Sequence, residues 1–273
     1  MQFAGKVAVI TGGASGIGKG TALAMARLGT EVVIADVNDQ RLDEARAEIA
    51  AFGGRTIAVH CDVSKDADIQ RLAKIALMEM GHVDILMNNA GVVLRGALEQ
   101  ISMEDWEWSF GINLLGVVRG ISAFLPHMIA RGSGHIINTG SIAGLVALTG
   151  EGAPYVASKF AVVGLSESLA LYARPRGIGV SVLCPGSVET NLHETERIVG
   201  MSPEIAQAEA RVQSVFHSVL MTPDQIGEIV VDAVRHNRFF ILPDRQQQSI
   251  ILRRAQDMNA FLEGRLTEYP ILE

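Results

Sequence analysis

The alternation of short apolar runs with longer amphipathic stretches constrains the fold of this sequence more than any other feature. Each run is rich in β-branched side chains and is too apolar for a strand with one face in water. Near-continuous apolar strands separated by helical segments indicate a parallel sheet covered by helices on both faces, the doubly wound α/β arrangement. The predicted strands are residues 6–10, 31–35, 56–60, 83–87, 135–138 and 180–183.

The length and composition favour one domain over residues 1–273. The chain has 273 residues, 48% of them hydrophobic, and no linker or low-complexity tract divides it. Residues 191–221 mix apolar and charged side chains, which predicts a helical substrate lid, although these side chains would equally suit a core beneath the lid. Residues 247–266 predict a C-terminal helical tail that covers a neighbouring subunit, covers its own pocket, or packs on its own domain.

Charge and cysteine usage exclude several classes of partner. The net charge of -7 argues against binding to nucleic acid or to an anionic membrane surface, because both need a basic patch. The start of the chain lacks the pattern of a secretory signal, and no apolar run approaches the ~20 residues that span a bilayer. Cys61 and Cys184 are expected to be buried free thiols, and the 7 histidines show no metal-ligand spacing. We therefore expect a cytoplasmic protein without a metal site.

A glycine-rich turn follows the first predicted strand and runs into a helix. Gly12, Gly16 and Gly18 allow a tight turn and a close backbone approach, which places a pyrophosphate at the helix N-terminus. The next strand ends at Asp36, where an acidic residue accepts hydrogen bonds from the adenosine ribose of a Rossmann-type dinucleotide site. A 2'-phosphate would meet a like charge there, so the sequence predicts NAD rather than NADP; the alternative is that Asp36 is a simple turn residue.

Tyr155 and Lys159 lie four residues apart in a helical stretch, with Ser141 shortly upstream. Residues at this spacing share a helix face, so an ammonium group can act on the phenol. A free tyrosine titrates near pH ~10, and a nearby cation lowers that pKa. Alone the pair is a weak signal, because any amphipathic helix can place both residues on its solvated edge.

Several motifs in one order strengthen this interpretation. The Thr-Gly-x-x-x-Gly-x-Gly turn, Asn88-Asn89-Ala90-Gly91, Asn113, Ser141, Tyr155, Lys159 and Pro185-Gly186 together resemble the short-chain dehydrogenase/reductase family over about residues 6–190. One departure is Gly140, which precedes Ser141 where many members carry serine.

The resemblance implies roles for the matching residues. Tyr155 resembles the acid/base, Ser141 would hold the substrate oxygen, Lys159 would contact the nicotinamide ribose and lower the pKa of Tyr155, and Asn113 would anchor a water. Asp84 and Asn88 are expected to be structural. The implied cofactor-binding residues are Gly12, Ser15, Gly16, Ile17, Gly18, Asp36, Asp62, Val63, Asn89, Ala90, Gly91, Tyr155, Lys159, Pro185, Gly186, Val188 and Thr190.

These residues predict an NAD-dependent alcohol dehydrogenase or carbonyl reductase that acts on an apolar secondary alcohol or ketone. The expected substrate contacts are Val93, Leu94, Leu148, Gly152 and His193, although a surface position is the simpler interpretation of His193. The alternatives are a 3-oxoacyl carrier-protein reductase, a non-catalytic NAD-sensing scaffold, and a sugar epimerase or dehydratase. The family also makes dimers and tetramers, so we expect a homo-oligomer built on the helix of Tyr155 and a late strand at residues 238–242.

Overall fold

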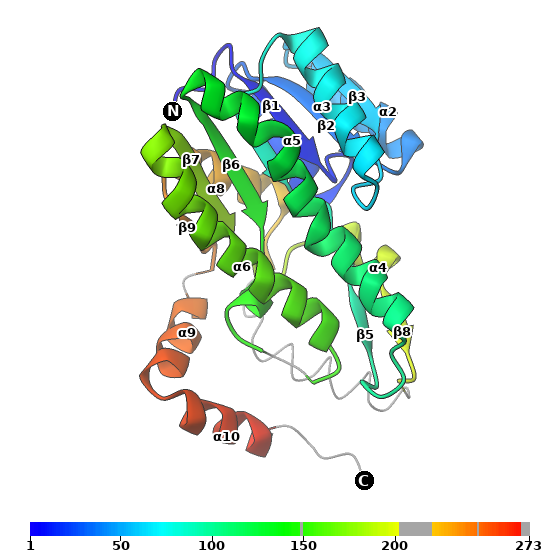
Figure 1. Cartoon of the computed structure of the whole chain (residues 1–273), viewed down its shortest axis with the longest axis vertical. Helices are drawn as coiled ribbons and strands as arrows, with labels where there is room; N and C mark the ends of the chain where they lie inside the picture. Colours follow the sequence, from blue (N-terminus) through cyan, green and yellow to red (C-terminus); the bar gives the residue numbers. More distant parts are fainter. Residues whose placement is uncertain (148–149, 202–219, 245, 269–273) are drawn as a thin grey trace.

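The computed structural model describes residues 1–147, 150–201, 220–244 and 246–268. In this part of the chain, seven parallel strands form one sheet with helices on both faces (Figure 1). The order across the sheet is β3 (Thr56–His60), β2 (Glu31–Asp36), β1 (Val7–Thr11), β4 (Ile85–Asn88), β6 (Gly134–Thr139), β7 (Ile178–Leu183) and β9 (Phe240–Ile241). The predicted doubly wound parallel sheet is confirmed.

Each central strand contributes side chains to two separate cores. Along β1, Ala8 and Ile10 enter one core, whereas Val7 and Val9 enter the other. Because successive side chains of a strand point to opposite faces, a strand covered on both sides must be apolar at every position. This requirement explains the unbroken apolar runs in the sequence.

The helices divide between the two faces. The first core contains buried side chains of α1 (Gly16–Ala26), α2 (Asp39–Ala50) and α8 (Pro223–Arg235). The second contains those of α3 (Asp66–Met80), α5 (Leu115–Arg131) and α6 (Ala153–Ala173). The remaining helical elements near the sheet are α4 (Met103–Asn113) and the short helices η1 (Ile142–Gly144), η2 (Arg174–Arg176) and η3 (Asn191–Thr195).

Polar side chains fix where several helices begin. Asn38 accepts a hydrogen bond from the backbone of Arg41 and so caps α2. Ser102 and Thr222 form capping boxes with the third residues of α4 and α8. Such caps satisfy backbone N–H groups that the first helical turn leaves without partners.

A small second sheet joins the start of the expected lid to the body. Strand β5 (Leu94–Gly96) pairs in parallel with β8 (Arg197–Val199), and an isolated bridge joins Val188 to Met221. Within the expected lid, the described residues thus form η3 and a strand, where the sequence suggested helices. Residues 202–219 lie outside the described part of the chain.

The C-terminal tail consists of α9 (Gln246–Gln256) and α10 (Met258–Glu268). Ile250 of α9 is buried with Ile142 and Val146, in the loop that follows Ser141, and Arg254 lies over the ring of Phe160 in α6. Figure 1 shows the two helices below α6, at the end of the molecule where this loop lies. The tail therefore packs on the loop after Ser141 and on α6 of its own chain.

Two helical stretches are long and apolar enough to cross a membrane, judged by length and composition alone. They are Met103–Arg131 and Ala153–Arg176, and 39% and 44% of their most apolar windows are buried in the protein. The expectation that no segment reaches this length is therefore not met. The physical reason is that these helices line the sheet, so that side chains such as Phe124 and Met128 are fully buried against it.

Candidate active site

A cavity of about 640 Å³ opens at the carboxyl ends of the central strands, where ligands bind in doubly wound sheets. Most of the predicted site residues meet in it. Those that line it are Gly12, Ser15, Gly16, Ile17, Asp36, Asp62, Val63, Asn89, Ala90, Gly91, Val93, Ser141, Gly152, Tyr155, Lys159, Pro185, Gly186, Val188, Thr190 and His193. Gly18, Leu94 and Asn113 lie buried behind the wall, and Leu148 lies outside the described residues.

The glycine turn has the shape of a phosphate cradle. Gly12 has a φ of 62°, a conformation that side chains other than glycine rarely adopt. A Cβ on Gly18 would lie 2.2 Å from the carbonyl oxygen of Gly12, so the helix start can pack this closely on the turn only with glycine there. The turn therefore presents the N-terminus of α1 to the cavity and fits the pyrophosphate of a dinucleotide.

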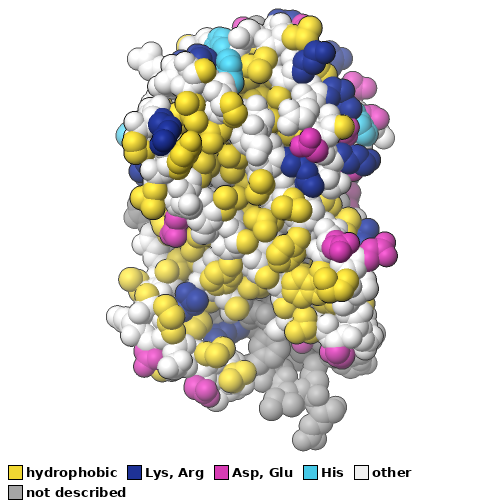
Figure 2. Space-filling view, in the orientation of Figure 1, with side chains coloured by type: hydrophobic (Ala, Val, Ile, Leu, Met, Phe, Trp, Pro, Cys, Tyr) yellow, Lys and Arg dark blue, Asp and Glu magenta, His cyan; other side chains and the backbone are white. Residues whose placement is uncertain are grey.

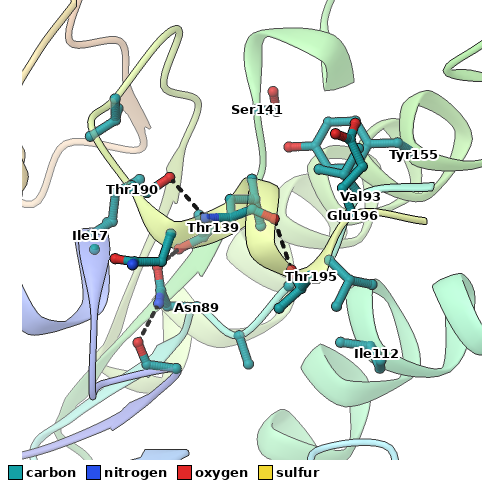
Figure 3. A pocket seen from close by; sticks show the side chains of 18 of the residues that line it. Ile17, Asn89, Val93, Ile112, Thr139, Ser141, Tyr155, Thr190, Thr195 and Glu196 are labelled. Atoms are coloured by element: carbon teal, nitrogen blue, oxygen red, sulfur yellow. Dashed lines mark hydrogen bonds between the residues drawn. The ribbon is translucent and has the colours of Figure 1, made fainter. Parts of the chain in front are cut away.

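Side chains at the ends of three strands lock this turn in place. The Thr11 hydroxyl accepts hydrogen bonds from the backbone N–H groups of Asn89 (3.0 Å) and Ala90 (3.2 Å). The Asn89 amide donates to the carbonyls of Thr11 and Gly12, both at 3.1 Å, and accepts from the Thr139 hydroxyl at 3.2 Å. Figure 3 shows Asn89 and Thr139 close together on the cavity floor. The ends of β1, β4 and β6 therefore act as one rigid floor.

Two carboxylates follow β2 and β3. Asp36 ends β2 and accepts hydrogen bonds from the backbone of Ala14 (3.4 Å) and Asn38 (3.1 Å). Burial opposes ionisation of Asp62, but hydrogen bonds from Ser64 and the nearby Lys65 ammonium hold its pKa below the usual range. A ribose or an adenine in this part of the cavity would therefore meet negative charge.

Tyr155, Ser141 and Lys159 meet at the opposite end of the cavity. Ser141 follows β6, and its hydroxyl caps η1 by accepting from Ala143 N at 3.1 Å. The Tyr155 hydroxyl points toward Ser141 (Figure 3). Lys159 lies one turn further along α6; its Nζ donates to the Thr139 carbonyl at 2.9 Å and lies 5.6 Å from the centroid of the Tyr155 ring.

Burial shifts the pKa of both titratable groups toward the neutral form. Burial raises the pKa of Tyr155, and the hydrogen bond from Ser141 only partly offsets this effect. Burial lowers the pKa of Lys159 to about 8. Cys184, beneath Ser141, has its pKa raised to about 12 by burial and stays neutral. Both cysteines are free and buried, which confirms the sequence prediction.

Asn113 contacts the backbone and α6 from behind the cavity wall. Its amide oxygen accepts from Val92 N (2.9 Å), and its amide nitrogen donates to Val92 O (3.0 Å) and to the Ser158 hydroxyl (3.2 Å). Ser158 in turn donates to the Tyr155 carbonyl at 2.7 Å. Asn113 therefore joins the end of α4 to the helical turn that carries Tyr155.

The segment after β7 closes the cavity from the far side. Its Pro185 carbonyl accepts from Ile142 N at 2.9 Å, which ties it to the loop of Ser141. The Thr190 side chain is so close to the glycine turn that a Cβ on Gly16 would lie 3.0 Å from it. Pro185, Val188 and Thr190 therefore lie between the glycine turn and Tyr155, where a nicotinamide group would be held.

The wall expected to contact substrate is more polar than the sequence suggested. Leu94, one of the expected substrate contacts, is fully buried and does not line the cavity. Because side chains alternate along a strand, it is Arg95 that faces the cavity. Arg95 pairs with Glu196 at 2.5 Å, and both side chains are at most one-fifth exposed. Figure 3 shows Glu196 and Thr195 among the lining residues, together with the apolar Val93 and Ile112.

A second ion pair at the cavity also escaped the sequence prediction. Arg41, in the first turn of α2, contacts Glu194 of η3 at 2.7 Å, and both line the cavity. Hydrogen bonds from Asn191 and Arg41 hold the pKa of Glu194 below its usual range, so this carboxylate is ionised at neutral pH. No local sequence signal reveals this pair, because its members are 153 residues apart. Across the described residues, no group of three or more His, Cys, Asp or Glu side chains is placed to hold a metal ion.

The sheet and the cavity together define a nucleotide-binding fold of the Rossmann type, and comparison with known proteins gives the family. The family model for short chain dehydrogenases matches residues 6–198. An uncharacterized oxidoreductase of Listeria monocytogenes is 36% identical over 236 residues, which cover 86% of this chain and 92% of that protein. The chain is also 39% identical to 3beta-hydroxysteroid dehydrogenase 2 of Eggerthella lenta over 193 residues, 70% of this chain and 74% of that protein.

A solved structure agrees with these relatives. The crystal structure of a short-chain dehydrogenase/reductase from Burkholderia phymatum in complex with NAD matches with a TM-score of 0.87 and 35% identity, over 95% of this chain and 96% of that one. This chain therefore belongs to the short-chain dehydrogenase/reductase family and is an oxidoreductase of that family.

Proposed function

We propose that this protein is an NAD-dependent dehydrogenase that interconverts a secondary alcohol and a ketone. The observation that carries the proposal is that Tyr155, Ser141 and Lys159 line the same cavity as the glycine turn and Asp36. A proton-transfer group and a dinucleotide cradle in one cavity are what hydride chemistry at a hydroxyl-bearing carbon requires.

In the direction of oxidation, Ser141 would hold the substrate hydroxyl by a hydrogen bond while Tyr155 accepts its proton. Nicotinamide, when bound, supplies the acceptor for the hydride that leaves the same carbon. Asn113, joined to the helical turn of Tyr155 through Ser158, keeps that turn in place. In the direction of reduction, Tyr155 returns the proton to the ketone oxygen.

Positive charge has to lower the pKa of Tyr155 during this reaction, because burial alone raises it. Lys159 is one source, since a pKa of about 8 leaves it mostly protonated at neutral pH. An oxidised nicotinamide ring, held by Pro185, Val188 and Thr190, would be the second. We infer that Tyr155 becomes an effective base only with both charges beside it.

We infer NAD rather than NADP from Asp36. Its carboxylate lies at the end of β2, and a ribose there can donate hydrogen bonds to it, whereas a 2'-phosphate would be repelled. The Burkholderia phymatum relative, which was crystallised with NAD, supports this choice. The same residue disfavours a 3-oxoacyl carrier-protein reductase that depends on NADPH.

The cavity favours a neutral substrate with an apolar body. Val93 and Ile112 provide apolar surface, and the Arg95–Glu196 pair adds a polar wall without net charge. The hydroxysteroid dehydrogenase among the relatives supports an alicyclic secondary alcohol. Candidates are best tested as a panel of secondary alcohols with NAD, followed by NADH absorbance, with NADP as the comparison.

Replacement of the catalytic tyrosine tests the proposal directly. Tyr155→Phe removes the hydroxyl but keeps the ring, so turnover should fall by about 10³-fold, within the usual range for loss of a general acid or base. The Kd for NAD, measured by calorimetry, should stay within twofold of wild type. Substantial residual turnover would contradict the proposal. Tight NAD binding by a wild-type protein that turns over no alcohol or ketone would instead favour the NAD-sensing scaffold.

We propose a cytoplasmic homo-oligomer, a dimer or a tetramer. Members of this family commonly form oligomers, and large apolar side chains are exposed on two helices of one face: Leu115 and Val118 on α5, and Leu171 and Tyr172 on α6. Figure 2 shows hydrophobic side chains gathered over this face. A monomeric mass by light scattering would contradict the oligomer.

A further inference from the structure

The ion pair between Arg41 and Glu194 lies at the end of the cavity that the adenosine ribose would occupy. Nη2 of Arg41 is 2.7 Å from Oε2 of Glu194, and about one-third of the Arg41 side chain remains exposed. The second carboxylate oxygen of Glu194 accepts from the Asn191 amide at 2.6 Å. Both oxygens of Glu194 are therefore engaged, and its position is fixed on η3.

Arg41 is linked to Asp36 through two hydrogen bonds. The Asp36 carboxylate accepts from Asn38 N at 3.1 Å, and the Asn38 side chain accepts from Arg41 N at 3.0 Å. Asp36, Asn38 and Arg41 all line the cavity. The cation of Arg41 and the carboxylate of Asp36 therefore belong to one short segment, at the point where a 2'-hydroxyl or a 2'-phosphate would lie.

A guanidinium group beside the ribose would ordinarily favour a 2'-phosphate, because arginine binds phosphate through paired hydrogen bonds. Glu194 opposes this preference in two ways. It occupies the Arg41 guanidinium, and it changes the summed formal charge of Asp36, Arg41 and Glu194 from zero to one negative. A phosphate that approaches the ribose site would have to displace a carboxylate to reach Arg41.

We propose that Glu194 is a cofactor-specificity residue. Asp36 disfavours the 2'-phosphate of NADP, and Glu194 strengthens the resulting preference for NAD by neutralising Arg41. The proposal rests on the proposed NAD-dependent function. It makes the start of the lid, rather than the β2–α2 turn alone, part of the discrimination between the two dinucleotides.

Glu194→Gln tests this role, because it removes the charge and keeps the size of the side chain. The Kd for NADP, measured by isothermal titration calorimetry, should tighten by about three- to tenfold, as expected when a partly exposed ion pair releases its cation. The Kd for NAD should change by less than twofold. The gain should shrink at high salt, since the charges are partly exposed, and it should disappear in the double variant with Arg41→Leu.

A matched control lies at the far end of the sheet. Arg55 and Glu79 form an exposed pair of the same residue types at 2.6 Å, and neither lines the cavity. Glu79→Gln should leave both Kd values unchanged. Both carboxylates are partly exposed, so both variants should keep the fold. Thermal unfolding of each variant checks this expectation.

The outcomes separate this proposal from the one on which it rests. A wild-type protein that prefers NAD, with an unchanged ratio of Kd values in Glu194→Gln, overturns the role of Glu194 and leaves the NAD assignment standing. A gain that persists without Arg41 also overturns it. A wild-type protein that binds NADP as tightly as NAD, or that binds neither, overturns both.

Discussion

The two ends of the sheet carry buried charge in opposite ways. At the amino ends of the strands, the buried Asp84 contacts Lys6, His82 and Arg131 at 3.0–3.3 Å and accepts a hydrogen bond from Val7 N. At the carboxyl ends, the buried Lys159 donates to a carbonyl, and no carboxylate contacts it in the described part of the chain. At the amino ends of the strands, the buried charge of Asp84 is fully paired. At the carboxyl ends, the charge of Lys159 remains available for catalysis.

The pKa shifts express this difference. Burial opposes ionisation of Asp84, but the Val7 hydrogen bond and the surrounding cations still hold its pKa below the usual range. Burial lowers the pKa of Lys159 to about 8, and among the described residues no carboxylate is paired with this side chain. Removal of one member of a fully partnered buried charge cluster therefore destabilises the fold, whereas a buried charge without a carboxylate partner is typical of a functional site.

Lys159→Met should have the largest effect and should change activity and stability in opposite directions. Turnover should fall by about 10²–10⁴-fold, because Tyr155 loses a cation that helps it ionise. Unfolded Lys159 keeps its proton up to about pH 10.5 and folded Lys159 only up to about pH 8, so the cost of burying the charge is present in full below pH 8. The variant should therefore be about 1–2 kcal/mol more stable at pH 7, after loss of the hydrogen bond to Thr139.

Urea unfolding and NADH formation measure the two quantities. A variant that is both inactive and less stable than wild type would break the contrast between the two ends of the sheet.

Asp84→Ala should affect stability alone. Removal of this carboxylate leaves the cations Lys6 and Arg131 without their shared partner and Val7 N without its acceptor, which should cost about 2–4 kcal/mol. The Kd for NAD should not change, because Asp84 lies at the far end of the strands. Chemical denaturation gives the first value and calorimetry the second.

A matched pair of threonines sharpens the comparison further. Thr11 at the rim accepts two backbone N–H groups, and Thr30 at the other end donates to the Phe3 carbonyl at 3.1 Å; both are buried. Thr11→Val and Thr30→Val should each lose about 1–2 kcal/mol of stability. Only Thr11→Val should also weaken NAD binding, by about three- to tenfold, since it loosens the floor under the glycine turn. Equal Kd values for the two variants would argue against that floor.

The smallest expected effect is on acid stability. A folded-state pKa of Asp84 below its unfolded value means that its stabilising contribution is complete above pH ~4 and is lost as pH falls through the folded pKa. The difference in unfolding free energy between wild type and Asp84→Ala should therefore narrow as the pH falls below about 4. A constant difference across this range would assign the effect of Asp84 to packing.

The sequence predicted the fold well because the strands are near-continuous apolar runs, and this pattern does not depend on distant residues. The strand at residues 56–60 agrees in full, and β4 begins at Ile85, two residues after the predicted start at Val83. The glycine turn and the Tyr155 helix were also predictable, since their motifs are local.

Contacts between distant segments were not predictable from the sequence. Strand β8 is three residues long and is a strand only because it pairs with β5, about a hundred residues earlier in the chain. The sequence also pointed to Leu94 in the cavity wall, whereas the structure places Arg95 there. A strand this short gives no sequence signal of which side chains face the cavity. The Arg41–Glu194 pair likewise exists only once α2 and η3 are brought together.

The small β5–β8 sheet also has a consequence for how this protein can diversify. Backbone pairing fixes the chain at Val199, and the bridge between Val188 and Met221 fixes it again where α8 is about to begin. For any chain segment whose two ends are fixed, the entropy of closure rises by only about 0.6 kcal/mol for each doubling of its length. Insertions and deletions between the anchors should therefore cost the fold little, so new substrate ranges can evolve there without disturbing the dinucleotide cradle.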